Sequence, residues 1–212
     1  MKKEIKEKNM ERRVIKTPVK ITRNEDGTIG SIYGYPIVYN KDSEDMGFIE
    51  RILPGAATKA LKGSDIRGLK NHDPSLIFAR EGINLKITED KQGVKYEATP
   101  VDTHNFRETA KEVDLGLLTG QSFGFRVLAD KWTDLDKDLP RRDITELEII
   151  FDVGPVTYPA YSDTSVALRS LTQMKQDAAT SAQDAETRAK DEQINLDIDI
   201  LNAARTEGGL QR

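Results

Sequence analysis

The chain reads LLTGQSFGFRV from residue 117 to residue 127. Successive side chains of an extended strand point to opposite faces, so Phe123, Phe125 and Val127 share one face. Ser122 lies on the other face, with a glycine two residues away on each side. This alternation predicts a half-buried strand whose polar face carries a serine with open space around its oxygen.

The same alternation recurs along the chain and predicts further strands. The clearest examples are residues 14–21, 29–35, 83–89 and 93–98, the last two flanking a turn at 90–92. Only two segments have a helical pattern, 54–61 and 105–118. Many strands without regular strand–helix alternation exclude a doubly wound fold. The pattern favours a mainly β, α+β domain, a closed or nearly closed antiparallel barrel with a few helices.

The second predicted helix has a distinct apolar face. Phe106, Ala110, Val113 and Leu117 recur at helical spacing and predict a stripe that faces the core. Asn105 is expected to cap this helix at its first turn.

The composition divides the 212 residues into three parts. A basic N-terminal tail is expected at 1–13, the folded domain at 14–169 and an acidic, alanine-rich tail at 170–212. This last tail lacks aromatic residues and is expected to be helical or disordered. Ile194 and Ile198 fit both helical and strand spacing, so a segment that docks on a scaffold and a simple linker both remain open.

The residue counts exclude several function classes. With 32 basic against 36 acidic residues the net charge is −4, which does not suggest a nucleic-acid-binding protein. The chain has no cysteine, which excludes disulfides, thiol catalysis and thiolate zinc sites. No apolar run is long enough to span a membrane. We therefore expect a protein of a reducing cytoplasm.

Ser122 needs a base to act as a nucleophile, and histidine is the usual one. The sequence offers two histidines, His72 and His104, and both precede Ser122. The pattern Gly-x-Ser-x-Gly is also found in α/β-hydrolases, but that fold places its histidine after the serine, so an α/β-hydrolase is excluded. Asp152, an acid within an apolar strand pattern, is a candidate to orient the imidazole, ahead of Asp102 and Asp73.

The residues alone leave less specific interpretations open for each candidate. Ser122 can be polar filler at a strand start, His72 a surface-turn histidine, and the face that carries Asp152 simply solvated.

Five blocks of the chain together resemble the head-maturation (prohead) proteases of tailed bacteriophages, which are similar to the herpesvirus assemblin serine proteases. In chain order they are 33–36 (YGYP), 50–56 (ERILPGA), 71–73 (NHD) with 79–80 (AR), 122–125 (SFGF) and 152–161 (DVGPVTYPAY).

This resemblance implies a serine endopeptidase with an assemblin-type antiparallel barrel and no metal or organic cofactor. Ser122 would be the nucleophile and His72 the general base, with Asp152 at the position where the family usually has Glu. Backbone N–H groups near Phe123 and Gly124 would stabilise the oxyanion. Arg80, which follows Ala79 where the family has glycine, would contact the oxyanion or the substrate.

The implied substrates are the scaffold, the scaffold-like segment of the major capsid protein, and the protease's own tails. The implied place of action is the assembling procapsid in the host cytoplasm, and similarity to the assemblins suggests a homodimer. The alternative is a catalytically inactive scaffold or assembly protein of the phage head, which only the aspartate at position 152 favours.

Overall fold

The computed structural model describes residues 9–158 and 165–208. The chain divides into two compact units, Met1–Arg169 and Ser170–Arg212. The three parts expected from composition, 1–13, 14–169 and 170–212, stay a prediction. Helix α4 (Ser165–Gly208) accounts for the described part of the second unit, so the expected C-terminal tail is helical there.

The first sheet consists of β1 (Glu11–Ile15), β4 (Ile49–Ile52), β5 (Arg67–Leu69), β6 (Ile77–Arg80), β9 (Gly120–Thr133) and β10 (Arg141–Val156). The pairing order is β1-β9-β10-β5-β6, and β4 also pairs with β10. Strands β9 and β10 form a long antiparallel pair, whereas β4 and β5 run parallel to β10. The expectation of antiparallel strands is therefore wrong for the pairings of β4 and β5 with β10.

The second sheet consists of β2 (Lys20–Arg23), β3 (Ile29–Val38), β7 (Leu85–Glu89) and β8 (Gly93–Ala98). It is antiparallel with the order β2-β3-β8-β7. The predicted hairpin is confirmed as β7–β8. Its turn is held by the Asp90 carboxylate, which accepts hydrogen bonds from the N–H groups of Gln92 (2.7 Å) and Gly93 (3.1 Å).

The expected α+β class, mostly strands with a few helices, is confirmed. The pairings of the described strands define two separate sheets and do not show a closed barrel. The barrel therefore stays a prediction.

The continuous strand expected at 14–21 is wrong, because the chain passes from the first sheet to the second within it. Strand β1 ends at Ile15 and β2 begins at Lys20. Between them the carbonyls of Thr17 and Pro18 accept hydrogen bonds from the buried Gln121 amide, and Pro18 has no N–H for a ladder. At the other end, β1 begins at Glu11, inside the expected N-terminal tail.

Both predicted helices exist with different limits. Helix α2 covers Thr58–Gly63 and begins after the turn that contains Pro54. Helix α3 covers His104–Asp114 and is capped by Thr103, whose hydroxyl accepts a hydrogen bond from Phe106 N (3.3 Å), so the expected cap at Asn105 is wrong.

The expected apolar stripe of α3 includes one residue that is not in the helix. The helix ends at Asp114, and Leu117, the last residue of the expected stripe, is 59% exposed. Gly116 follows the helix with φ 72°, a left-handed conformation that terminates helices.

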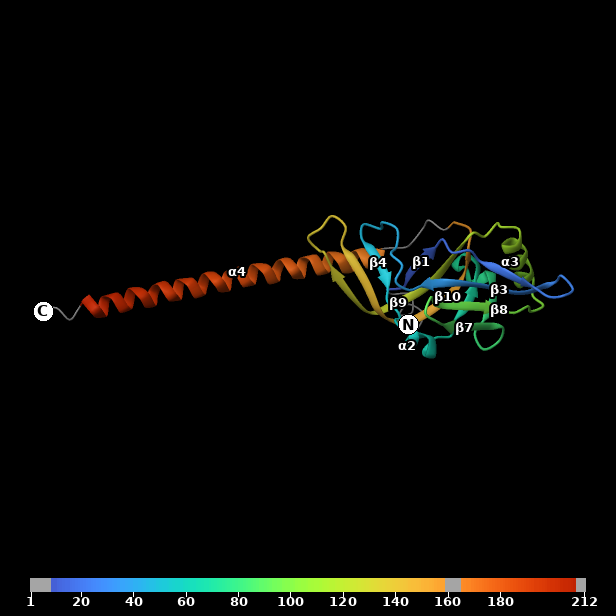
Figure 1. Cartoon of the computed structure of the whole chain (residues 1–212), viewed down its shortest axis with the longest axis horizontal. Helices are drawn as coiled ribbons and strands as arrows, with labels where there is room; N and C mark the ends of the chain where they lie inside the picture. The colour runs from blue at the N-terminus through green and yellow to red at the C-terminus, as the bar shows by residue number, and fades with distance from the viewer. Residues whose placement is uncertain (1–8, 159–164, 209–212) are drawn as a thin grey trace. The chain divides into compact units, whose positions relative to one another are not determined.

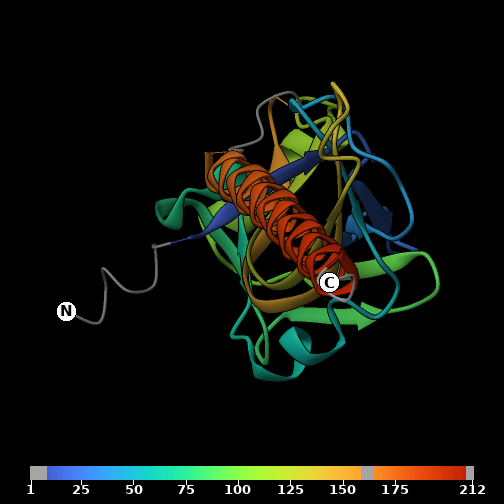
Figure 2. The ribbon, with the colours of Figure 1, turned by 90° about the vertical axis from the view of Figure 1, so that its left-hand side faces the viewer.

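Residues of both sheets and of both short helices pack into one hydrophobic cluster. Phe123 and Phe125 of β9 and Tyr96 of β8 are fully buried in it. In Figure 1, α2 and α3 lie outside the strands that enclose this core, and Figure 2 shows the same strands after a 90° turn. The alternation around Ser122 thus gives β9 its core-facing side, as predicted.

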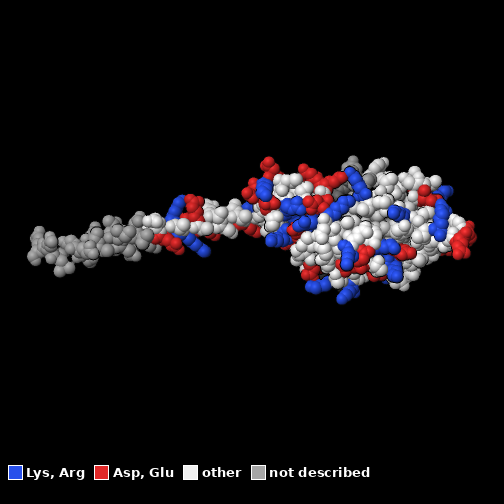
Figure 3. Space-filling view, viewed as in Figure 1, with Lys and Arg blue, Asp and Glu red and all other residues white. Residues whose placement is uncertain are grey.

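Acidic and basic side chains lie interspersed on the face of the first unit that Figure 3 shows. Partly exposed ion pairs of this unit include Arg51–Asp143 (3.0 Å) and Arg141–Asp42 (2.8 Å). Such pairs contribute about 0–1 kcal/mol each, so the apolar core supplies most of the stability. No helix among the described residues has the length and apolar character needed to cross a membrane.

Candidate active site

Ser122 and Asp152 lie on the neighbouring strands β9 and β10. The antiparallel register places Gly154 opposite Ser122 and Gly124 opposite Asp152. Residues directly opposite each other project to the same face of a sheet. Each of the two polar side chains therefore faces a glycine, which leaves space for a third group between them.

Neither glycine has room for a side chain. A Cβ atom on Gly124 would lie 2.5 Å from Asp152 Oδ2, and one on Gly154 would lie 2.0 Å from the carbonyl oxygen of Leu69. The first glycine gives room to the carboxylate. The second lets the end of β5 pack directly on β10.

His72 enters this space from the 3-10 turn η1 (Lys70–His72), which directly follows β5. Because β5 pairs in parallel with β10 through Arg67↔Asp152, the turn lies alongside the acid. Asn71 and His72 both have left-handed backbone angles, with φ 53° and 59°. This conformation costs a non-glycine residue about 1–2 kcal/mol, so it must be held by other contacts.

Two side chains of the turn provide these contacts. The Asn71 side chain accepts a hydrogen bond from Thr157 N (2.9 Å) and donates one to Thr157 Oγ1 (3.1 Å). Lys70 Nζ forms an ion pair with Glu112 of α3 (2.7 Å). The turn is thereby fixed at both the end of β10 and the helix.

The structure brings together His72, Ser122 and Asp152. His72 Nδ1 lies 2.5 Å from Asp152 Oδ1, and His72 Nε2 is hydrogen-bonded to Ser122 Oγ. Ser122 is 1% exposed and Asp152 5%. When Nδ1–H donates to the carboxylate, the lone pair of Nε2 faces the serine hydroxyl, which is the arrangement of a nucleophile, a base and an orienting acid.

Ser122 has a second partner that the sequence analysis missed. Its hydroxyl donates a hydrogen bond to the main-chain carbonyl oxygen of Arg13 in β1 (2.8 Å). The register of β1 and β9 places Val14 opposite Ser122. No motif or spacing in the sequence links these strands, which are 109 residues apart.

The other residues considered for the base and the orienting acid have different partners. His104 is the exposed first residue of α3, and Asp102 forms an ion pair with Arg107. Asp73 accepts hydrogen bonds from Ser75 Oγ (2.7 Å) and Ser75 N (2.8 Å), which lower the pKa of its carboxyl. These bonds cap the following turn η2 (Pro74–Leu76).

Arg80 lies at the end of β6 and forms a two-pronged ion pair with Asp65, at 3.0 and 3.1 Å. Among the described residues, Arg80 forms no hydrogen bond or ion pair with Ser122, His72 or Asp152. Its expected oxyanion or substrate contact stays a prediction.

The residues expected to provide oxyanion N–H groups lie within the sheet. The Phe123 ring is buried and stacks on Phe125, with ring centroids 4.6 Å apart. Residues 121–125 of β9 have partners in both β1 and β10. The oxyanion role of the Phe123 and Gly124 backbone stays a prediction.

A buried ionic network lies on the opposite face of β1 and β9. Arg13 Nε and Nη2 bind the two oxygens of Glu50 (2.7 and 2.9 Å), and Arg142 binds Glu11 (2.8 and 3.0 Å). All four residues are at most 5% exposed. Burial alone would raise the pKa of Glu11, but its hydrogen bonds and ion pairs with Arg142 and Arg13 outweigh this and lower it. Sequence analysis assigned these residues no such role.

Comparison with known proteins finds a matching family and a similar solved structure. The family model described as caudovirus prohead serine protease matches residues 17–177. Among solved structures, the capsid assembly protease of bacteriophage T4 is similar at 14% identity and a TM-score of 0.48, over 70% of this chain and 97% of that one. No curated protein matches the chain.

Proposed function

Because the chain belongs to the caudovirus prohead serine protease family, we propose that it is an active serine endopeptidase that matures the phage capsid. The observation that carries this proposal is the partly buried chain of hydrogen bonds from Asp152 through His72 to Ser122. In this proposal Ser122 is the nucleophile, His72 the general base and Asp152 the orienting acid.

The proposed reaction is acyl transfer in two steps. The Ser122 oxygen forms a bond to the peptide carbonyl carbon while its proton passes to His72 Nε2. The C–N bond then breaks, and His72 returns the proton to the leaving amine. Water hydrolyses the resulting ester by the same route, which releases the acid product and restores the serine hydroxyl.

The backbone N–H groups of Phe123 and Gly124 are proposed to stabilise the oxyanion. Such a donor contributes about 3–4 kcal/mol in serine proteases. Asp152 would hold the imidazole in the tautomer that accepts the serine proton and would stabilise the imidazolium that forms.

The proposed substrates are the scaffold or the scaffold-like segment of the major capsid protein, and also the tails of the protease itself. The proposed place of action is the assembling procapsid. The resemblance to assemblins also implies a closed barrel and a homodimer, and light scattering of the purified chain tests the second.

A catalytically inactive assembly protein is the competing function. The feature that favoured it was aspartate where the family usually has glutamate. The separation of 2.5 Å between Asp152 Oδ1 and His72 Nδ1 argues against that reading, because the shorter side chain still reaches the imidazole.

The experiment follows the intact mass of the purified chain over time, alone and with the capsid protein. Ser122→Ala and His72→Ala are prepared identically. We expect wild-type chain alone to trim itself and to cleave the capsid protein. Cleavage that persists in Ser122→Ala, or no cleavage of either protein by wild type, would contradict the proposal.

A further inference from the structure

A substrate has no free sheet edge beside Ser122. Residues 121–125 of β9 pair with β10 on one side and with β1 on the other. Extended peptides bind sheets by adding a strand at an edge, and the attacked carbon must come within about 3–3.5 Å of the serine oxygen. Because β10 forms the centre of the sheet, the position of β1 is where an extended substrate can lie.

Strand β1 places a main-chain carbonyl beside the serine hydroxyl. The Arg13 carbonyl oxygen lies 2.8 Å from Ser122 Oγ. The serine hydroxyl has one proton, for which this carbonyl and His72 Nε2 compete. The oxygen of Arg13, rather than its carbon, accepts this hydrogen bond, so the Arg13 carbonyl is not posed for attack.

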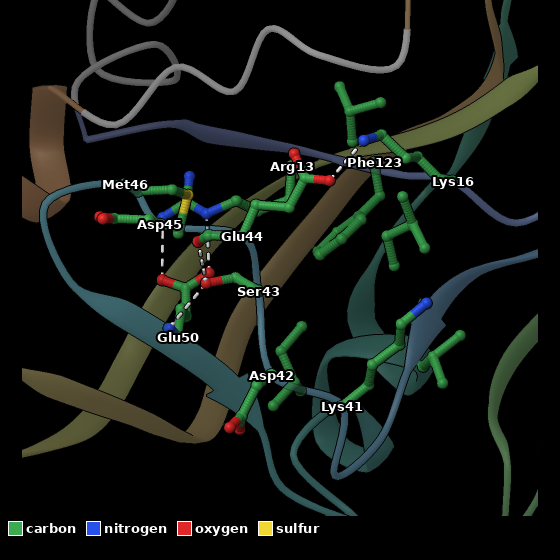
Figure 4. A pocket seen from close by; sticks show the side chains of 14 residues that line it. Arg13, Lys16, Lys41, Asp42, Ser43, Glu44, Asp45, Met46, Glu50 and Phe123 are labelled. Carbon is green, nitrogen blue, oxygen red and sulfur yellow. Dashed lines mark hydrogen bonds and ion pairs between the residues drawn. The ribbon is translucent and has the colours of Figure 1, made fainter.

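The Arg13 side chain extends into a recess on the core-facing side of β9. Glu50 binds its guanidinium through both carboxylate oxygens, as Figure 4 shows, and the Phe125 ring centroid lies 5.4 Å away. Arg13 is only 5% exposed. A planar guanidinium with a two-pronged carboxylate partner is a specific recognition arrangement.

The charges of this recess suit the β1 sequence. Without β1 it contains Glu50, Asp130 and Arg142, a net charge of −1; Asp130 pairs with Arg142 at 2.7 Å. Arg13 supplies a cation that pairs with Glu50, while Glu11 adds a negative charge, so the net charge of the group stays −1 with β1 in place. Glu11, two residues earlier, binds Arg142 through both carboxylate oxygens. The recess therefore matches a peptide with an acidic residue, any residue and then a basic residue, as in residues 11–13 of this chain.

A cavity of about 350 Å³ lies beside the Arg13–Val14 bond and adjoins the recess, since Arg13 and Glu50 are among its lining residues. The rest of its lining includes the second half of β1 and residues 41–46, the loop seen in Figure 4. Lys16 and Glu44, whose side chains are mostly exposed, pair across it. This cavity provides room for residues that follow a cleaved bond.

We propose that β1 occupies the substrate groove of this chain, and that the recess ending at Glu50 binds an arginine or lysine side chain at the residue before the cleaved bond. Arg142 binds an acidic side chain two residues earlier. This inference rests on the proposed function. It assigns the substrate class, a basic extended peptide segment, and identifies Glu50 as the residue that determines specificity.

The test uses internally quenched peptides with the sequence of residues 9–18, NMERRVIKTP. A second peptide has glutamine at the position of Arg13, and a third has glutamine at the position of Glu11. Each is incubated with the full-length wild type and with full-length Arg13→Ala, Glu50→Gln and Ser122→Ala. Lys20→Ala, at an exposed position of β2, is the control variant.

We expect cleavage after the arginine that corresponds to Arg13, identified by product mass. The glutamine-13 peptide should be cleaved at least tenfold more slowly in kcat/KM, and the glutamine-11 peptide at least threefold more slowly. In Glu50→Gln, the ratio of kcat/KM between the parent peptide and the glutamine-13 peptide should fall below threefold. Arg13→Ala should cleave the parent peptide at least tenfold faster than wild type, because its own β1 competes less, while Lys20→Ala should match wild type.

The outcomes separate this inference from the proposed function. Mass spectrometry after treatment with a fluorophosphonate measures whether Ser122 is reactive. Three results overturn the inference alone if Ser122 reacts with the fluorophosphonate. All three peptides stay intact, or they are cleaved at another bond, or the arginine and glutamine-13 peptides are cleaved at equal rates. Equal rates for Arg13→Ala and wild type overturn the occupancy by β1. If no variant reacts and none trims itself, the proposed function fails as well.

Peptide preference is also measured on wild type, so the test does not depend on a variant that fails to fold. The melting temperature of each variant is recorded beside its rate. In Arg13→Ala, Glu50 keeps its contact with Arg142 (2.9 Å), which leaves one partner for the buried carboxylate.

Discussion

Replacing Gly124 by alanine should impair the reaction by moving Asp152. The new Cβ would lie 2.5 Å from Asp152 Oδ2, whereas ordinary van der Waals contact begins near 3.4 Å. The carboxylate must therefore move by about 0.9 Å. This movement disturbs the 2.5 Å contact between Asp152 Oδ1 and His72 Nδ1. A misplacement of about 1 Å costs a catalytic site roughly 100-fold in rate.

The assay measures the rate at which a fluorophosphonate reacts with Ser122, followed by intact mass. We expect Gly124→Ala to react about 100-fold more slowly than wild type. Gly63→Ala should match wild type, because a Cβ at this position in α2 meets nothing within 4 Å. The φ angle of Gly124 is not in the left-handed region, so alanine introduces no backbone strain that would account for the loss.

A double variant shows whether the effect passes through Asp152. Asp152→Asn alone should react about 10,000-fold more slowly, the loss seen when a triad acid is neutralised. Adding Gly124→Ala to Asp152→Asn should change the rate by less than about threefold, because the carboxylate is already absent. A further 100-fold loss in the double variant, or a Gly124→Ala rate equal to wild type with an unchanged melting temperature, would refute the reasoning.

Three more predictions concern the supports of the site. Asp152→Glu should slow phosphonylation of Ser122 at least tenfold, since the existing 2.5 Å contact leaves no room for another methylene; an unchanged rate would count against the tight fit. Asn71→Ala should lower the free energy of unfolding by about 1–3 kcal/mol, measured with urea, because it removes both bonds to Thr157 and the residue type that tolerates φ 53°; equal stability would show that the turn is held elsewhere. Because the pKa of Glu11 is lowered in the folded chain, its ionised form stabilises the fold above the unfolded pKa of about 4.3 and loses this effect as the pH falls below it. Glu11→Gln should therefore be less stable at pH 7 and lose less melting temperature than wild type between about pH 5 and pH 3; parallel curves would contradict the assignment.

Local patterns predicted the parts of the fold that depend on neighbours in the chain. The β7–β8 hairpin and the core-facing side of β9 follow from alternation and turn residues. The strand expected at 14–21 was wrong, because alternation continues through Pro18 although the chain changes sheet there. The cap of α3 was also misassigned, since Asn105 instead donates to the carbonyls of Ser75 and Ile77.

The sequence by itself determined which residues are available for chemistry. It has two histidines and one serine between spaced glycines, and its blocks resemble a protease family. Only the tertiary structure brought His72 to Ser122, 50 residues away, and to Asp152, 80 residues away. It also placed β1 over Ser122 and joined Arg13 to Glu50. The physical reason is that periodicity fixes which face of a strand is apolar, whereas partner and register depend on burial summed over strands that are distant in the chain.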